Sequence, residues 1–213
     1  MFRDLFLHPR FADDVGLVAV GGDLRPERLL LAYRRGVFPC FGEHDPVCWW
    51  SPDPRGIFEL DGLHLSRRLE RTLRGGRFTV TVNRDFAGVI AGCADRPAKE
   101  AWLVPSMVAA YTRLHALGHA HSVEVWHAGA LAGGLYGVAV GGLFAGESMF
   151  SRVSDASKVA LAFLVGRLRE RGFGLFDIQW RNEHTKRLGA VEIPRGEYLR
   201  RLRAALGVEA TFA

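Results

Sequence analysis

Polar and apolar residues alternate along several short segments of the chain, and this pattern predicts β-strands. The alternation covers residues 78–82 and 122–126, and a longer apolar run covers residues 131–140. Because Ala128-Gly129 separates the last two segments, they are expected to form a hairpin. Shorter strands are predicted at residues 143–145 and 174–180. In the latter, Asp177 and Gln179 are two apart and are expected on one face, opposite Phe176 and Ile178.

Other segments place apolar residues every three or four positions, which predicts helices. The ranges are 63–77, 86–93, 105–117, 156–171, 182–189 and 197–206, and a further helix follows the turn at Gly21-Gly22. Their first turns are expected to be capped by side-chain oxygens of Asp23, Ser66, Ser154 and Asp155. The free backbone N–H groups at residue 156 would also make a seat for an anion, unless the segment is only a capped connection.

Prolines interrupt the segment between residues 37 and 56. Pro39, Pro46, Pro52 and Pro54 exclude a long helix or a central strand there, so the aromatic residues of this segment are expected on an extended, irregular ribbon. Such aromatic rings either stack on bases or a substrate, or form a small core beneath a loop. The ribbon is the boundary we predict between two domains, residues 1–60 and 61–213.

The charge of the chain suggests an anionic partner. Among 213 residues the net charge is +5, and only three of the 28 basic residues are lysines. Arginine suits phosphate, which favours a nucleic acid; a bias in base composition would explain the arginine content but not the positive sign. On the predicted helix 63–77, Leu69 and Leu73 are expected to face inward, and a basic stripe faces outward, either as a phosphate track or as a solvated surface: Arg67, Arg68, Arg71, Arg74 and Arg77.

Cysteine and histidine spacing argues against a disulfide framework and a metal site. The three cysteines form no CxxC pair, and His115, His119 and His121 lack the acidic partner of an HExxH motif. No secretion signal or bilayer-spanning apolar run is found, so a cytoplasmic protein without metal is expected.

Polar residues follow directly on the strand at 143–145. Glu147, Ser148, Ser151 and Arg152 come at its exit, a position that favours function. The order of strands and helices resembles the acyltransferase (GNAT-like) fold of acetyl-CoA enzymes, but residues 151–158 lack the pyrophosphate loop R/QxxGxG/A of that class. An acyl group delivered on a nucleic acid would account for the aromatic ribbon and the arginines together.

Several longer motifs carry a specific resemblance. GGDL at 21–24, RGVFP at 35–39, WWSPDPR at 49–55, HAHSVEVW at 119–126 and LFAGESMFSR at 143–152 occur in order, followed by HT at 184–185 and LGA at 188–190. In order and spacing they resemble the bacterial leucyl/phenylalanyl-tRNA-protein transferases over nearly the whole chain.

The resemblance implies an α+β protein: a small N-terminal α/β domain and a GNAT-like mixed-sheet catalytic domain. It implies transfer of leucine or phenylalanine from Leu-tRNA or Phe-tRNA, through the 3′ aminoacyl-adenosine end, to proteins with N-terminal Arg or Lys, which marks them for degradation. It further implies a cytoplasmic monomer without metal, cofactor or membrane partner.

The resemblance also implies roles for individual residues. Glu147, Asp177 and Gln179 are the expected catalytic group: Gln179 orients the amine, Asp177 stabilises its developing charge, and Glu147 holds the acceptor's amine, its cationic side chain or the donor ribose. The expected substrate-binding residues are Leu135, Phe144, Met149 and Phe176 for the donor side chain, Trp102 for the adenine, and Ser148.

One position departs from the family pattern. Cys40 stands where a tryptophan is expected, and Phe41 or Trp49 would have to replace that aromatic surface. Two other functions fit the residues: an N-acyltransferase with a different donor, which would not depend on tRNA, or a non-catalytic RNA-binding module, in which Glu147, Asp177 and Gln179 are structural.

Overall fold

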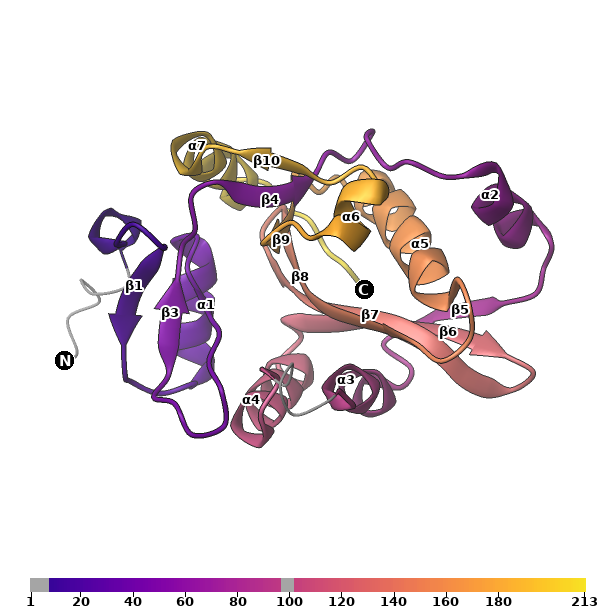
Figure 1. The fold of residues 1–213 in the computed structure, drawn as a ribbon, viewed down its shortest axis with the longest axis horizontal. Coiled ribbons are helices and arrows are strands. Elements are labelled where there is room, and N and C mark those ends of the chain that lie inside the picture. The colour runs from indigo at the N-terminus through magenta and orange to yellow at the C-terminus, as the bar shows by residue number, and fades with distance from the viewer. Residues whose placement is uncertain (1–7, 97–101) are drawn as a thin grey trace.

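The smaller of two β-sheets is built from the N-terminal part of the chain. The computed structural model describes residues 8–96 and 102–213. Strands β1 (Leu17–Val20), β3 (Cys48–Trp50) and β2 (Phe38–Pro39) form an antiparallel sheet in the order β1-β3-β2, with the 3-10 helix η2 (Pro9–Phe11) beside β1. Helix α1 (Pro26–Arg34) lies between this sheet and the rest of the molecule (Figure 1). Because β2 is an edge strand, Pro39 leaves no ladder hydrogen bond unmade.

The larger sheet organises the remaining chain and has seven strands within the described residues. Its order is β10 (Val191–Ile193), β4 (Arg55–Phe58), β9 (Leu175–Gln179), β8 (Leu143–Ser151), β7 (Ala130–Val140), β6 (Ala120–His127) and β5 (Thr79–Val82). Of these neighbours, β8 and β9 are parallel and the others antiparallel. The predicted hairpin is confirmed as β6–β7, and so is the α+β class with a small N-terminal unit before a mixed sheet. The chain enters the large sheet at Arg55, between β10 and β9.

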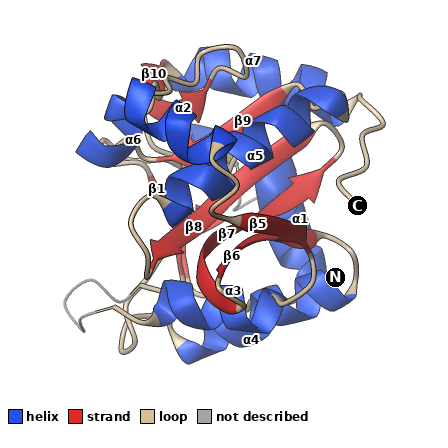
Figure 2. Cartoon of the chain, turned by 90° about the vertical axis from the view of Figure 1, so that its right-hand side faces the viewer, coloured by secondary structure: helices blue, strands red, loops and turns tan. Residues whose placement is uncertain are grey.

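Helices cover both faces of the large sheet (Figures 1 and 2). One face carries α3 (Phe86–Ala94) and α4 (Pro105–Ala116), and the other carries α5 (Ala156–Glu170), with α2 (Arg67–Arg74) beside it. Helices α6 (Glu183–Arg187) and α7 (Arg195–Leu206) flank β10. One apolar cluster joins α1 and the small sheet to α3 and α4, so the two units share a core. A second cluster lies under α5.

Three sequence-based expectations are wrong, two about where an element begins or ends and one about which face of a helix is buried. Asp23 does not cap α1, whose N-cap is Arg25; its carboxylate instead accepts from the Arg25 backbone N–H at 3.1 Å. Strand β8 runs to Ser151 rather than ending after Ala145, because it continues to pair with β7. Leu73 is 37% exposed, whereas Leu69 is buried and Ser66 caps α2 as predicted.

The start of α5 also differs from its expected form. Asp155 occupies the N-cap position, but its carboxylate binds Lys158 at 2.9 Å and Arg68 at 3.2 Å instead of capping the helix. The Ser151 hydroxyl accepts the Ser157 backbone N–H at 3.3 Å. Part of the predicted anion seat is therefore occupied by the chain itself. Across residues 8–96 and 102–213, every helix is too short or too polar to span a bilayer.

Candidate active site

A cavity of about 580 Å³ opens where β8 and β9 part. The two strands pair only as far as Ala145 and Asp177, after which β8 stays with β7 and β9 stays with β4. Residues of both strands line the cavity beyond that point, and Phe38, Pro39 and Cys40 close it from the small sheet. Its volume is in the range of pockets that enclose a small ligand.

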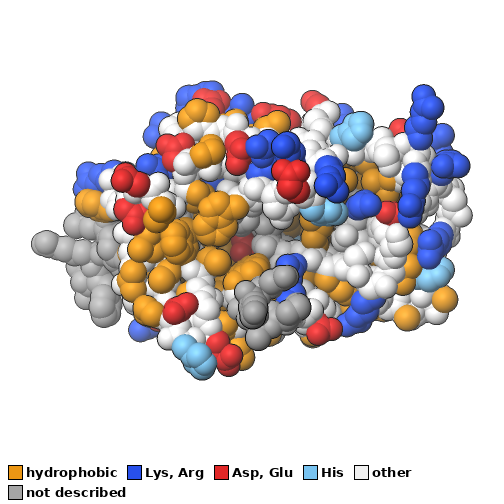
Figure 3. Space-filling view, in the orientation of Figure 1, with side chains coloured by type: hydrophobic (Ala, Val, Ile, Leu, Met, Phe, Trp, Pro, Cys, Tyr) orange, Lys and Arg blue, Asp and Glu red, His pale blue; other side chains and the backbone are white. Residues whose placement is uncertain are grey.

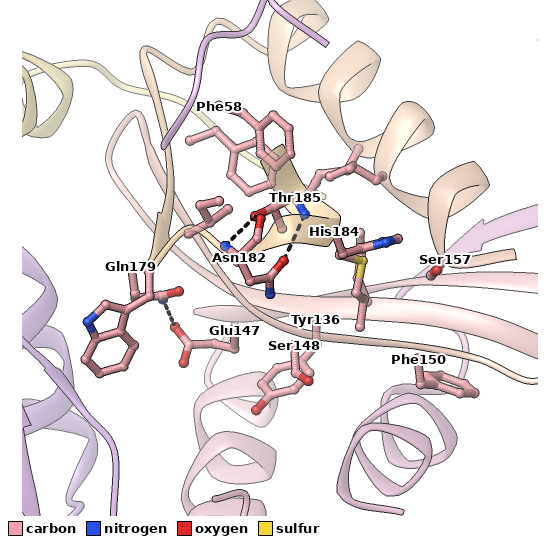
Figure 4. A pocket seen from close by; sticks show the side chains of 18 of the residues that line it. Phe58, Tyr136, Glu147, Ser148, Phe150, Ser157, Gln179, Asn182, His184 and Thr185 are labelled. Atoms are coloured by element: carbon pink, nitrogen blue, oxygen red, sulfur yellow. Dashed lines mark hydrogen bonds between the residues drawn. The ribbon is translucent and has the colours of Figure 1, made fainter. Parts of the chain in front are cut away.

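Glu147 is aimed into this cavity by a β-bulge. Gly146 pairs with Gly137 and Ser148 pairs with Tyr136, so Glu147 has no partner on β7. A bulge of this kind turns a side chain away from the regular alternation. Figure 4 shows the Glu147 carboxylate facing Gln179, whose side-chain amide donates to it at 3.0 Å.

Two tyrosines complete the surroundings of Glu147. Tyr33 of α1 donates its hydroxyl to one carboxylate oxygen at 2.8 Å, and Tyr111 of α4 donates to the other at 2.9 Å. Burial raises the pKa of Glu147 to about 7, although the two tyrosine hydrogen bonds lower it in part. Burial also raises the pKa of Tyr33 and of Tyr111 well above the usual value, so both remain hydrogen-bond donors near neutral pH.

Asp177 is buried behind the cavity rather than in its wall. Its carboxylate accepts from Arg55 at 2.7 and 2.8 Å, from the Tyr198 hydroxyl at 2.8 Å and from the Gln179 backbone N–H at 2.9 Å. Arg55 is equally buried and also donates to the Gly36 carbonyl at 3.0 Å. Asp177 is absent from the cavity lining formed by the described residues.

The expected common face of Asp177 and Gln179 is therefore not seen. Asp177 pairs with Ile57 and Gln179 with Gly56, which leaves Ile178 between them without a partner. Gln179 also adopts a left-handed backbone with φ of 59°. Because the alternation breaks here, Gln179 turns to Glu147, and Ile178 lines the same cavity as Gln179.

One end of the cavity is apolar. Leu135, Met149 and Phe176 line it as expected, but Phe144 lies behind the wall and is fully buried. Phe58, whose ring stacks on Phe176 at 5.4 Å, is part of the lining (Figure 4). Four further apolar residues of the lining could not be told from ordinary core residues in the sequence: Phe58, Leu161, Leu164 and Ile178.

The mouth of the cavity is aromatic and polar. Trp102 and Ser148 line it as expected, together with Arg96 and His184. Trp49, expected at the substrate site, is fully buried instead and donates its indole N–H to the Gly21 carbonyl at 2.9 Å.

A further aromatic ring, with no role expected from the sequence, also lies at this mouth. Trp180 is 43% exposed, lines the cavity, and packs edge-on against Phe38 at 4.7 Å and Trp50 at 5.9 Å. Cys40 lies in the same wall, whereas Phe41 is buried and absent from the lining formed by the described residues. The signal in the sequence was a tryptophan directly after a polar strand end.

The five arginines expected to bind tRNA lie on or next to α2, away from the cavity lining. All are exposed, and Figure 3 shows basic side chains gathered over α2 at the right-hand end. Arg68 pairs with Asp155, and Arg74 pairs with Glu70 at 3.7 Å. Arg67 and Arg71 form no ion pair within the described residues.

The three histidines line one cavity of about 330 Å³, but His115 and His121 make separate hydrogen bonds. His115 contacts the Ala120 carbonyl at 2.8 Å, and His121 contacts the Asn83 amide at 3.0 Å. Among the residues that the structure describes, no three His, Cys, Asp or Glu side chains gather in a way that would hold a metal ion.

Comparison with known proteins assigns the chain to a family. The family model described as leucyl/phenylalanyl-tRNA protein transferase matches residues 57–203, and the model for the N-terminal domain of that family matches residues 22–53. The chain belongs to the leucyl/phenylalanyl-tRNA protein transferase family. The resemblance seen in the sequence motifs is thereby confirmed.

Two relatives from this family cover most of the chain. A leucyl/phenylalanyl-tRNA–protein transferase of Solidesulfovibrio magneticus is 53% identical over 94% of this chain and 83% of its own length. The Ruegeria pomeroyi transferase is 57% identical over 89% of this chain and 90% of its own length. Among solved structures, a ribosomal-protein-alanine N-acetyltransferase of Brucella melitensis biovar Abortus 2308 matches with a TM-score of 0.38 and 19% identity, over 50% of this chain and 81% of its own.

The buried Arg55–Asp177 pair yields a stability prediction. Asp177→Ala leaves the Arg55 guanidinium buried without its counter-ion, so we expect a loss of about 3–5 kcal/mol in the free energy of unfolding, measured with urea. The double variant Arg55→Met/Asp177→Leu is the control and is expected to lose less than Asp177→Ala alone. A single-variant loss below about 1 kcal/mol would contradict the assigned role of the pair.

Proposed function

We propose that this protein transfers leucine or phenylalanine from its charged tRNA to the α-amine of an N-terminal Arg or Lys. One cavity supports this proposal most. It has an apolar end, and its lining also contains Glu147 of β8 and Gln179 of β9, which form a hydrogen bond across the gap between these strands. The apolar end suits an aliphatic or aromatic side chain, and the carboxylate suits a cationic acceptor. Membership of the transferase family supports the same donor and acceptor.

The donor enters with its side chain at the apolar end. Leu135, Met149, Phe58 and Phe176 surround it, and the ester lies toward Glu147 and Gln179. We assign the terminal adenine to the aromatic mouth, where Trp102 offers one surface and the exposed ring of Trp180 offers another. Trp180 then serves in place of the tryptophan that Cys40 replaces.

The reaction is an aminolysis of the ester. The neutral α-amine attacks the carbonyl carbon, a C–N bond forms, the C–O bond to the ribose breaks, and one amine proton ends on the departing ribose hydroxyl. An α-amine has a pKa of about 7.7–8.0, so a useful fraction is neutral at pH 7 and orientation supplies most of the acceleration. The Gln179 amide is too weak a base to take the proton and instead orients the amine.

Asp177 takes a different role from the one expected. Because it lies behind the wall, it acts on Gln179 by holding its backbone N–H at 2.9 Å, and we assign it as a positioning residue. Glu147 faces the cavity, and we assign it to the cationic acceptor.

The tRNA body lies along α2, where Arg67 and Arg71 bind phosphates. The enzyme works in the cytoplasm, where charged tRNA is available.

The decisive test is a transfer assay with radiolabelled Leu-tRNA and Phe-tRNA. Two peptides that differ only in an N-terminal Arg or Ala serve as acceptors. We expect label on the Arg peptide alone. No transfer despite intact tRNA binding would favour the RNA-binding module, and modification of the peptide by another activated donor without tRNA would favour the alternative acyltransferase.

The raised pKa of Glu147 predicts a pH dependence of acceptor use. Below pH 7 the carboxylate becomes protonated and loses its attraction for a cation. As pH drops from 8 to 6, kcat/KM for the Arg peptide is therefore expected to fall more steeply than protonation of the α-amine alone would cause. In Glu147→Gln this additional decrease should vanish. An unchanged profile in the variant would exclude Glu147 as the titrating group.

The exposed arginines of α2 predict a salt effect. Arg67→Ala/Arg71→Ala should weaken tRNA binding and reduce the slope of log K against log salt by about 0.7–0.9 for each phosphate that the variant no longer neutralises. Filter binding at several salt concentrations measures both the affinity and the slope. Arg113→Ala/Arg203→Ala removes the same charge from α4 and α7 and should leave the slope near that of the parent protein; equal slopes in both double variants would rule out the α2 track.

A further inference from the structure

The segment after α7 returns to the core and inserts one aromatic ring. Phe212 is 2% exposed, although residues 207–213 form no helix or strand. In Figure 1 this segment, in yellow, runs from α7 toward α5. Its ring stacks on Phe144 at 5.0 Å and lies edge-on to Phe173 at 6.2 Å.

A continuous series of rings connects Phe212 to the cavity. Phe144 contacts Phe176 at 5.9 Å, and Phe176 stacks on Phe58 at 5.4 Å. Phe176 and Phe58 line the apolar end of the cavity, whereas Phe144 and Phe212 do not appear in that lining. Phe144 and Phe212 thus form a second layer of rings. This layer lies behind Phe176 and Phe58, which form the wall against the donor side chain.

Two glycines show how closely the rings of Phe144 and Phe176 are packed against the backbone of the large sheet. A Cβ on Gly137 would lie 2.5 Å from the Phe144 ring, and a Cβ on Gly146 would lie 2.9 Å from the Phe176 ring. A residue larger than glycine at position 137 or 146 would therefore clash with one of these rings. Because interiors are close-packed, a ring confined on one side by backbone shifts mainly toward the side where packing is removed. For Phe144, that side is the one that Phe212 fills.

Side chains from α5 and β6 hold the Phe212 segment in place. The Arg167 side chain of α5 donates to the Phe212 carbonyl at 2.7 Å, and its guanidinium lies 5.3 Å from the ring centroid. His121 packs against the ring at 4.7 Å; burial lowers its pKa to about 4, so it packs as a neutral ring at pH 7. A second cavity of about 330 Å³, lined by His121, Asn83 and residues 210–213, adjoins the segment. This cavity lies beside the Phe212 segment rather than beside the donor cavity.

We propose that Phe212 is a positioning residue for donor selection. It holds Phe144 against Gly137 and, through Phe144, fixes the Phe176 wall, which sets the depth of the pocket for the donor side chain. This inference rests on the proposed function, since it concerns the choice between leucine and phenylalanine. Removing the ring lets Phe144 and Phe176 move back, which deepens the pocket and favours the larger donor.

The test compares kcat/KM for Phe-tRNA and Leu-tRNA, with the Arg peptide as acceptor. In Phe212→Ala the Phe-to-Leu ratio of kcat/KM is expected to rise about threefold to tenfold, a change within the range that pocket shape controls. Phe212→Leu, which keeps most of the packing, should stay within about twofold of the parent ratio. Arg167→Ala, which loosens the segment without removing the ring, should shift the ratio in the same direction by less.

A matched truncation separates selection from stability. Ile90→Ala removes a buried side chain of α3 in the other apolar cluster and should lower the melting temperature without moving the ratio. An unchanged ratio in Phe212→Ala overturns the inference, and so does an equal shift in Ile90→Ala. If Phe212→Ala does not fold, unchanged ratios in Arg167→Ala overturn it. Absence of transfer by the parent protein from either charged tRNA would instead refute the proposed function.

Discussion

The buried ion pair of Arg55 and Asp177 is the constraint on which the arrangement of the site depends. Both side chains are about 1% exposed, and a charge buried this deeply is tolerated only with its partner and its hydrogen bonds in place. Arg55 also binds the carbonyl of Gly36 after α1, and Asp177 also binds Tyr198 of α7. The end of α1, β4, β9 and α7 are therefore fixed relative to one another, and Gln179 is held at the point where β9 leaves β8.

The reactive side of the site arises from two irregularities in neighbouring strands. The bulge at Glu147 and the unpaired Ile178 turn one polar side chain from each strand into the gap between them. Regular pairing through this region would have filled the gap with backbone hydrogen bonds. Glu147 is then enclosed by Tyr33 from α1 and Tyr111 from α4, so the small N-terminal unit contributes directly to the acidity of a residue in the large sheet.

Sequence periodicity predicted the elements well and the local geometry less well. The β6–β7 hairpin and the Ser66 cap follow from turn and cap chemistry that is local in the chain, and both are confirmed. The separation of Asp177 from Gln179 was not predictable, because a bulge depends on the partner strand rather than on the spacing of two residues. Arg55 and Tyr198 were also missed, since they are 143 positions apart and only the fold brings them together.

The same ion pair has a consequence for the synthesis of the chain. Arg55 leaves the ribosome 122 residues before Asp177, an interval of about 6–24 s at about 5–20 residues per second. During that interval its guanidinium has no buried carboxylate to meet, so β4 and the end of α1 have to remain hydrated. The nascent chain thus acquires its complete site only in a late step, after β9 has been synthesised. Until then the N-terminal unit lacks the ion pair that fixes it to the large sheet.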